Sequence, residues 1–236
     1  MFIIIFTYVI IISIYNIDMK FIYFYSDLYE YYNKHINENL NSVFDLEAIK
    51  IDNLKNNSCH TFFGGVSIKI DLILQKIKEN MGNSIIFTDA TIFINSNNIN
   101  ELVDFFYKYL DNDLCFADND GKGYYNIGII LIKCNIKTLT FFENVLADLT
   151  NNHGWDQDII NKHLCNNENL KVNTFDRTKI YCNWDFNPSY RYTYLIFKSF
   201  IQHDKNANKT FNKRLDIFKK FELITNEEYN ANYKNE

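Results

Sequence analysis

A single carboxylate follows an apolar segment in the middle of the chain. Residues Ser84 to Thr88 predict a buried strand, Asp89 comes directly after it, and Thr91 lies two positions further on. A carboxylate cannot be buried cheaply, and at the end of a strand it can bind a hard cation or a ribose hydroxyl. The same position also suits an aspartate that only forms a turn or caps a helix. Asp89 is therefore a candidate ligand-binding residue, and the alternative is that its role is only structural.

A second polar interruption lies in the strand predicted over Tyr125 to Lys133. Asn126 and Gly128 break an otherwise apolar segment there. Glycine weakens a strand, and it often marks a bulge or a place where a ligand comes close to the backbone. The alternative is that both residues only begin the strand after the turn at 121–123.

Two further motifs lie later in the chain. Asp156 and Gln157 begin a predicted helix directly after Trp155, and His203 follows a short apolar segment. An aspartate at a helix start more commonly caps the helix, and an isolated histidine is more commonly a surface or packed residue than a metal ligand. Each motif alone is weak evidence for a site.

Strands and helices alternate from Met19 onward, and this order predicts how the motifs are positioned. Strands are predicted over 21–25, 43–51, 84–88, 113–117 and 125–133, and helices over 27–39, 70–81, 98–109, 139–149, 156–164 and 211–221. This alternation predicts a single α/β domain, with a mixed, mostly parallel sheet flanked by helices. Ligands of such sheets bind beyond the carboxyl ends of the strands, where Asp89 is expected.

The composition excludes several classes of protein. The chain has 236 residues, of which 47% are hydrophobic, so it can form a globular core. Its 24 Lys and Arg against 29 Asp and Glu leave no basic surplus, and nucleic acid is therefore not expected as a partner. The five cysteines are scattered, which fits neither a disulfide framework nor a zinc site.

The first residues form an uncharged apolar segment. Residues 1–17 contain no charged side chain, although they fall short of the roughly 20 residues that span a membrane. A signal anchor and a dispensable extension ahead of Met19 are both compatible with this pattern, and a buried strand is a third interpretation. We expect an apolar leader over 1–18 and a folded domain over 19–236, either membrane-anchored or cytoplasmic.

The order of the four motifs resembles that of the GT-A-fold nucleotide-diphospho-sugar glycosyltransferases, especially those of large DNA viruses. In that family a D-x-D motif binds the donor diphosphate through a divalent metal ion, and an N-x-G strand lines the donor-sugar pocket. A D-Q pair begins a helix at the sugar, and a late histidine completes the metal site. By resemblance, these roles belong to Asp89, to Asn126 and Gly128, to Asp156 and Gln157, and to His203. The resemblance extends from about residue 20 to about residue 221.

The resemblance implies a reaction and its partners. A sugar would move from a nucleotide-diphosphate-sugar donor to a hydroxyl of a glycan, a protein or a small molecule, with Asp156 and Gln157 as catalytic residues and retention at the anomeric carbon favoured. Asp89 and His203 would hold Mn²⁺ or Mg²⁺, and Lys69 would contact a donor phosphate. A viral protein of this kind would act in the host cytoplasm or a viral factory.

One position departs from the family pattern. Thr91, in the expected donor site, stands where the family has its second carboxylate, and a neutral hydroxyl is a poorer ligand for Mn²⁺ or Mg²⁺. Lys69, Lys122 and Lys205 could supply positive charge instead. The alternatives are a loosely held ion, a transferase without one, and a non-catalytic nucleotide-sugar-binding protein with a degenerate metal site. A metal-dependent hydrolase is more distant, because no second cluster of acids supports it.

Overall fold

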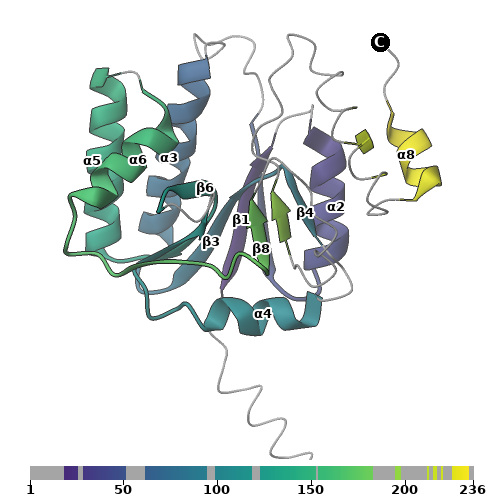
Figure 1. Ribbon diagram of the computed structural model, residues 1–236, viewed down its shortest axis with the longest axis horizontal. Coiled ribbons are helices and arrows are strands. Elements are labelled where there is room, and N and C mark those ends of the chain that lie inside the picture. Colours follow the sequence, from purple (N-terminus) through teal and green to yellow (C-terminus); the bar gives the residue numbers. More distant parts are fainter. Residues whose placement is uncertain are drawn as a thin grey trace, which may run out of the picture.

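The computed structural model describes most of the chain from Met19 onward. The described residues are 19–25, 29–51, 62–94, 99–118, 123–152, 154–182, 195–197, 212, 215, 216, 219 and 225–233. In chain order the elements are β1 (Lys20–Tyr25), α2 (Glu30–Leu40), β2 (Asp45–Lys50), α3 (Phe62–Glu79), β3 (Ser84–Asp89), β4 (Ile92–Ile94), α4 (Ile99–Tyr107), β5 (Leu114–Asp118), β6 (Tyr125–Lys133), α5 (Ile136–Asn152), α6 (Asp156–Cys165), β7 (Val172–Thr174), β8 (Ile180–Cys182), β9 (Leu195–Phe197) and α8 (Asn226–Asn232). Figure 1 shows the central sheet between α3, α5 and α6 on one side and α2 on the other.

The central sheet is mixed and mostly parallel, as the sequence predicts. Its six strands have the order β2-β1-β3-β6-β5-β7. The strands β2, β1 and β3 are parallel, and so are β5 and β7, whereas β6 is antiparallel to both of its neighbours. The strands β4, β9 and β8 form a second, three-stranded sheet. Because β6 lies between β3 and β5, the N-x-G motif is adjacent to the strand that ends in Asp89.

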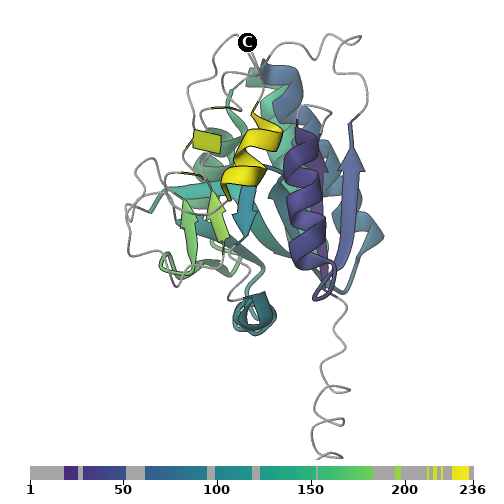
Figure 2. The same ribbon diagram turned by 90° about the vertical axis from the view of Figure 1, so that its right-hand side faces the viewer.

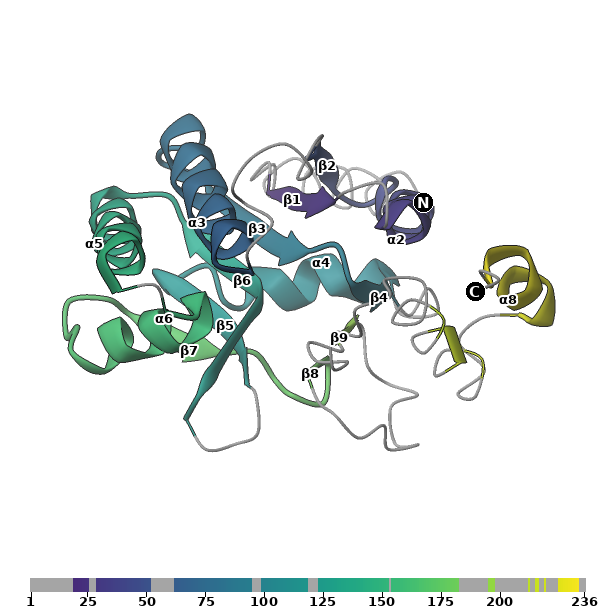
Figure 3. The same cartoon turned by 90° about the horizontal axis from the view of Figure 1, so that it is seen from above.

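Side chains of the central strands alternate between two cores. Phe21 and Tyr23 of β1 lie in the core shared with α2, α4 and the small sheet, while Ile22 lies in the core shared with α3, α5 and α6. Both faces of the sheet are thus covered, which explains the nearly continuous apolar sequence of these strands. Figure 3 shows the two groups of helices on opposite sides of the sheet, and in Figure 2 α2 and α8 face the viewer while α4 is seen end-on.

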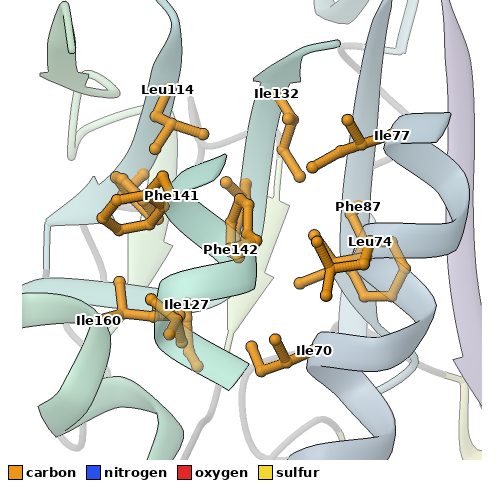
Figure 4. Packing of buried hydrophobic residues seen from close by; sticks show 14 of the residues in the cluster. Ile70, Leu74, Ile77, Phe87, Leu114, Ile127, Ile132, Phe141, Phe142 and Ile160 are labelled. Carbon is orange, nitrogen blue, oxygen red and sulfur yellow. The ribbon is translucent and has the colours of Figure 1, made fainter. Parts of the chain in front are cut away.

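The helix α3 follows the apolar spacing of its sequence. Ile70, Ile73 and Ile77 are completely buried and face the sheet, and Figure 4 shows Ile70 and Ile77 on the same face of α3 as Leu74. This spacing places them on one side of a helix. The chain then turns at Gly82, whose φ of 90° is a conformation that glycine adopts without strain. The helix α3 also brings Lys69 to the face of the sheet that these isoleucines cover.

The elements predicted between residues 19 and 165 are present with shifted ends, and several short elements were not predicted. The helix α3 begins at Phe62 rather than at residue 70, because residues 62–69 include two glycines and lack a clear helical pattern. The strands β4, β7, β8 and β9 have three residues each, too few for a periodic signal. The leader over 1–18, the first residue of the helix predicted over 98–109 and most of the helix predicted over 211–221 lie outside the described residues. Among the residues that are described, no helix is long and apolar enough to cross a membrane.

Candidate functional site

The strand β3 carries Asp89 to the edge of the buried core. The five residues before Asp89 are buried, and Asp89 itself is partly exposed. The N–H of Ile92 donates to the carbonyl of Ala90 at 2.9 Å, so a tight turn centred on Thr91 leads directly into β4. Asp89 and Thr91 therefore lie together where a buried strand reaches the surface, as the sequence predicts.

Lys69 of α3 forms an ion pair with Asp89. Its Nζ lies 2.8 Å from Asp89 Oδ1, and the Lys69 side chain is 5% exposed against 35% for Asp89. The same Nζ donates to the carbonyl of Ile127 at 2.8 Å. A buried ammonium is costly unless it is paired and hydrogen-bonded, and both conditions are met here. Lys69 thus connects α3 to β3 and to β6. Its ammonium lies on the buried side of the Asp89 carboxylate and not on the surface.

The N-x-G motif forms a bulge in β6. Phe116 of β5 pairs with Ile130, but the next residue, Ala117, pairs with Asn126, so residues 127–129 have no partner on β5. Asn126 Oδ1 accepts a hydrogen bond from the N–H of Gly128 at 2.8 Å. The interpretation of the glycine as the mark of a bulge is therefore confirmed.

Side chains from three other elements bind the backbone of this bulge. Thr88 Oγ1 donates to the carbonyl of Gly128 at 2.8 Å, Lys69 donates to the carbonyl of Ile127, and Gln157 Oε1 accepts from the N–H of Ile127 at 3.4 Å. A bulge removes backbone groups from the ladder, and buried backbone groups need other partners. Polar residues of the candidate site therefore also support the local backbone.

The helix α6 begins after a glycine that packs against the side chain of Ile159. A Cβ on Gly154 would lie 2.9 Å from Ile159 Cδ1, so only glycine fits there without a shift. Trp155 is the N-cap residue and is 40% exposed. Asp156 is the first helical residue, and its Oδ1 accepts from the N–H of Gln157 at 2.9 Å. Asp156 is therefore not the N-cap residue of this helix.

Three charged side chains influence one another at this site. Burial raises the pKa of Asp156, the positive charge of Lys69 opposes this shift, and the negative charge of Asp89 adds to it. The three residues come from α6, α3 and β3, which are far apart in the sequence. Gln157 and Lys69 both contact the backbone of Ile127, so the start of α6, which carries Asp156, lies beside the ion pair.

Tyr124, Asp158 and Asn161 belong to the same region, and the sequence analysis did not identify them. The Tyr124 hydroxyl donates to Asp158 Oδ1, and burial together with this contact raises the pKa of Tyr124 to about 12. Asn161 is buried and binds the backbone of Tyr125. In the sequence, Asn161 directly follows Ile159 and Ile160, which the structure shows to be buried. An asparagine at the apolar side of a helix is the signal that could have identified it.

The structure brings most of the predicted site residues together. Around the bulge of β6 lie Lys69, Asp89, Asn126, Gly128, Asp156 and Gln157. His203, Lys122 and Lys205 lie outside the described residues.

The described residues fit a divalent cation poorly. Asp89 is already paired with Lys69, and Thr91 contributes no charge. Within the described ranges, no group of three or more His, Cys, Asp or Glu could hold a metal ion. His203, the other expected ligand, is not among the described residues, so its role stays a prediction.

Comparison with known proteins gives the family. A model of the nucleotide-diphospho-sugar transferase family matches residues 33–215. Among solved structures, a glycosyltransferase involved in the glycosylation of the major capsid of PBCV-1 is 11% identical, with a TM-score of 0.56 over 78% of this chain and 96% of that chain. The apo-form glycosyltransferase GlyE of Streptococcus pneumoniae TIGR4 is 13% identical, with a TM-score of 0.55 over 92% of this chain and 63% of that chain. No curated protein sequence matches significantly.

These comparisons agree with the geometry of the site. The two structural neighbours are too distant in sequence to show more than the fold, which is the GT-A-like α/β fold expected from the sequence. The family match covers most of the chain and includes every residue around the bulge of β6. The chain therefore belongs to the nucleotide-diphospho-sugar transferase family.

Proposed function

We propose that this protein transfers a sugar from a nucleotide-diphosphate-sugar donor to a hydroxyl of an acceptor. The family match supports this class of reaction. The observation that carries the proposal is the meeting of Asp156, Lys69 and Asp89 at the end of β3, beside the bulge of β6. The ends of sheet strands are where α/β proteins bind their ligands.

Sugar transfer makes demands that this site can meet. As the bond to the diphosphate breaks, the anomeric carbon becomes electron-poor and negative charge develops on the leaving group. We assign Asp156 to the sugar, where its carboxylate would stabilise the electron-poor carbon or orient the acceptor hydroxyl. Gln157, whose Oε1 faces the backbone of Ile127, holds this end of α6 against the bulge. Positioning and electrostatics would supply most of the catalysis.

Several finer points rest on the family resemblance. A hexosyl donor and retention at the anomeric carbon are favoured on that ground. The resemblance also implies Mn²⁺ or Mg²⁺ on Asp89 and His203, although the described residues fit such an ion poorly. The acceptor is a glycan, a protein or a small molecule, and the exposed ring of Trp155 beside Asp156 offers it a flat apolar surface. The uncharged apolar sequence of residues 1–17 is compatible both with anchoring to a membrane and with a dispensable extension.

The alternative is a protein that binds nucleotide-sugars without transferring the sugar. The neutral Thr91 at the position of the second acid favours it. Binding alone requires the donor pocket, whereas transfer also requires Asp156 beside the sugar.

A product assay separates the two functions. The full chain is incubated with UDP-, GDP- and CDP-sugars and with a set of sugar and peptide acceptors, and release of nucleoside diphosphate is measured beside donor binding. Release that depends on an acceptor supports the transferase. Binding without release under every condition supports the binding protein, and the absence of both contradicts the proposed function.

A further inference from the structure

The ion pair at the end of β3 is neutral without any added ion. Asp89 contributes one negative charge, Lys69 one positive charge, and Thr91 none. Divalent cations bind where oxygen ligands provide an excess of negative charge. The pair provides no such excess, because the ammonium of Lys69 lies 2.8 Å from Asp89 Oδ1. Asp156 adds a carboxylate nearby, but no group of three or more His, Cys, Asp or Glu in the described part of the chain could hold a metal ion.

Lys69 cannot easily leave Asp89 to admit a cation. Its side chain is 5% exposed, and its Nζ also donates to the carbonyl of Ile127. Moving the ammonium would leave that carbonyl without this bond and would separate a buried charge from its partner, and both changes are costly. Lys78 on the same helix is exposed and more loosely paired. Its side chain is 58% exposed, and its Nζ lies 3.7 Å from Glu143 Oε1. The pair of Lys69 and Asp89 is therefore part of the core rather than a surface contact.

The ammonium also removes an electrostatic obstacle to a diphosphate. An unpaired carboxylate at the strand end would repel the donor diphosphate, and a divalent cation between the two is one way to overcome this repulsion. Here Lys69 neutralises the carboxylate of Asp89 from its buried side. Its hydrogen bond to the carbonyl of Ile127 also holds the bulge of β6 in place. One buried side chain performs both tasks.

We propose that Lys69 is a positioning residue that takes the place of a resident divalent cation, so that this protein binds its nucleotide-sugar donor without a metal ion. The inference rests on the proposed function, since it concerns how the same site accepts the donor. It assigns Lys69 to Asp89 and to the backbone of β6, and not to direct contact with a phosphate.

The inference predicts how metal ions affect the wild-type protein and the Lys69→Met variant. Chelation should change the Kd of the wild type for a nucleoside diphosphate by less than about twofold. Lys69→Met leaves Asp89 unpaired and should weaken binding in chelator by about tenfold or more, because the unpaired carboxylate then repels the diphosphate. Mn²⁺ should recover part of this loss, because the unpaired carboxylate can then hold a cation. A purely structural role of Lys69 would not create a dependence on Mn²⁺.

Calorimetric titrations of the full chain with UDP, GDP and CDP, each with EDTA and with Mn²⁺, test this. Lys78→Met is the matched control, and it should bind like the wild type in both conditions. Lys69→Arg keeps the positive charge and should stay independent of metal ions, which covers the case in which Lys69→Met fails to fold. Titration of the wild type with Mn²⁺ alone requires no variant and should show no binding, whereas Thr91→Asp should bind the ion.

The possible results separate this inference from the proposed function. Wild-type protein that binds a nucleotide only with Mn²⁺, or that binds Mn²⁺ alone, overturns the role of Lys69 and leaves the transferase intact. A folded Lys69→Met variant that behaves like Lys78→Met overturns it as well. If no nucleotide binds in any condition, the proposed function fails, and this inference fails with it.

Discussion

The side chain of Asn161 binds both backbone polar groups of Tyr125. Asn161 Oδ1 accepts from the N–H of Tyr125 at 2.8 Å, and Asn161 Nδ2 donates to the carbonyl of Tyr125 at 2.9 Å. The amide thus acts on the first residue of β6 as a neighbouring strand would. Because Asn161 belongs to α6, this contact fixes the helix that carries Asp156 against the strand that carries the bulge.

Replacement of this asparagine should therefore affect stability and the site together. In Asn161→Ala both backbone groups of Tyr125 lose buried partners, and we expect the free energy of unfolding to fall by about 2 to 3 kcal/mol. Urea unfolding monitored by circular dichroism measures this change. Asn166→Ala, at the exposed C-terminal end of the same helix, should change stability by less than about 0.5 kcal/mol. Equal stabilities for the two variants would show that Asn161 is not the main attachment of α6.

Asp156 should be required for turnover more than for binding. Asp156→Asn keeps the shape of the side chain and removes its charge, so we expect kcat to fall by about 100-fold or more, as is usual for the loss of an electrostatic catalytic group. The Kd for the donor should change by less than about fivefold, because binding energy comes mainly from the rest of the donor. Steady-state kinetics and calorimetry measure the two quantities. Asp104→Asn, an exposed aspartate of α4, is the matched control and should retain full activity.

His35 should make the fold sensitive to acid. Its Nε2 accepts from the N–H of Ile94 at 3.1 Å, its ring stacks on Phe93, and burial lowers its pKa from 6.5 to about 4, against the opposing charges of Glu228 and Glu38. Since the folded protein binds this proton less readily than the unfolded chain, the stabilisation is complete above pH 6.5 and is lost as the pH falls toward 4. The loss should be at most about 3 kcal/mol.

Unfolding free energies at pH 7, 5.5 and 4 check this dependence. The His35→Gln variant can still accept from Ile94 but does not titrate, so its stability should fall less steeply with pH than that of the wild type. Parallel curves for the two proteins would show that another group causes the acid sensitivity.

The leader should be dispensable for folding. Met19 is 5% exposed and lies in the same core as Phe21, so a chain that begins at Met19 retains its buried residues. We expect deletion of residues 1–18 to give a folded, monodisperse domain with an unchanged melting temperature, as measured by circular dichroism and size-exclusion chromatography. Aggregation of the shortened chain would show instead that the leader is a buried part of the fold.

The sequence predicts the long elements and the bulge, because their signals are local. The apolar residues of β3 and β6 and the helical spacing of α3 reflect burial directly, and Gly128 marks the bulge. The ion pair of Lys69 with Asp89 could not be predicted, since it depends on how α3 packs against two strands. For the same reason the sequence identified Lys69 only as a candidate phosphate contact, whereas its ammonium lies buried beneath the carboxylate.

The most direct test of the account is whether the protein binds a nucleotide-sugar. Thermal unfolding of the full chain is measured with UDP-, GDP- and CDP-sugars, with and without Mn²⁺. At a concentration of 100 times Kd, a ligand that binds only the folded state adds about 2.7 kcal/mol, which raises the melting temperature of a chain of this size by several degrees. We predict such a shift for at least one nucleotide-sugar, and the same shift in chelator. The absence of a shift with every nucleotide-sugar, with Mn²⁺ present as well as absent, would contradict the assignment of this site to sugar transfer.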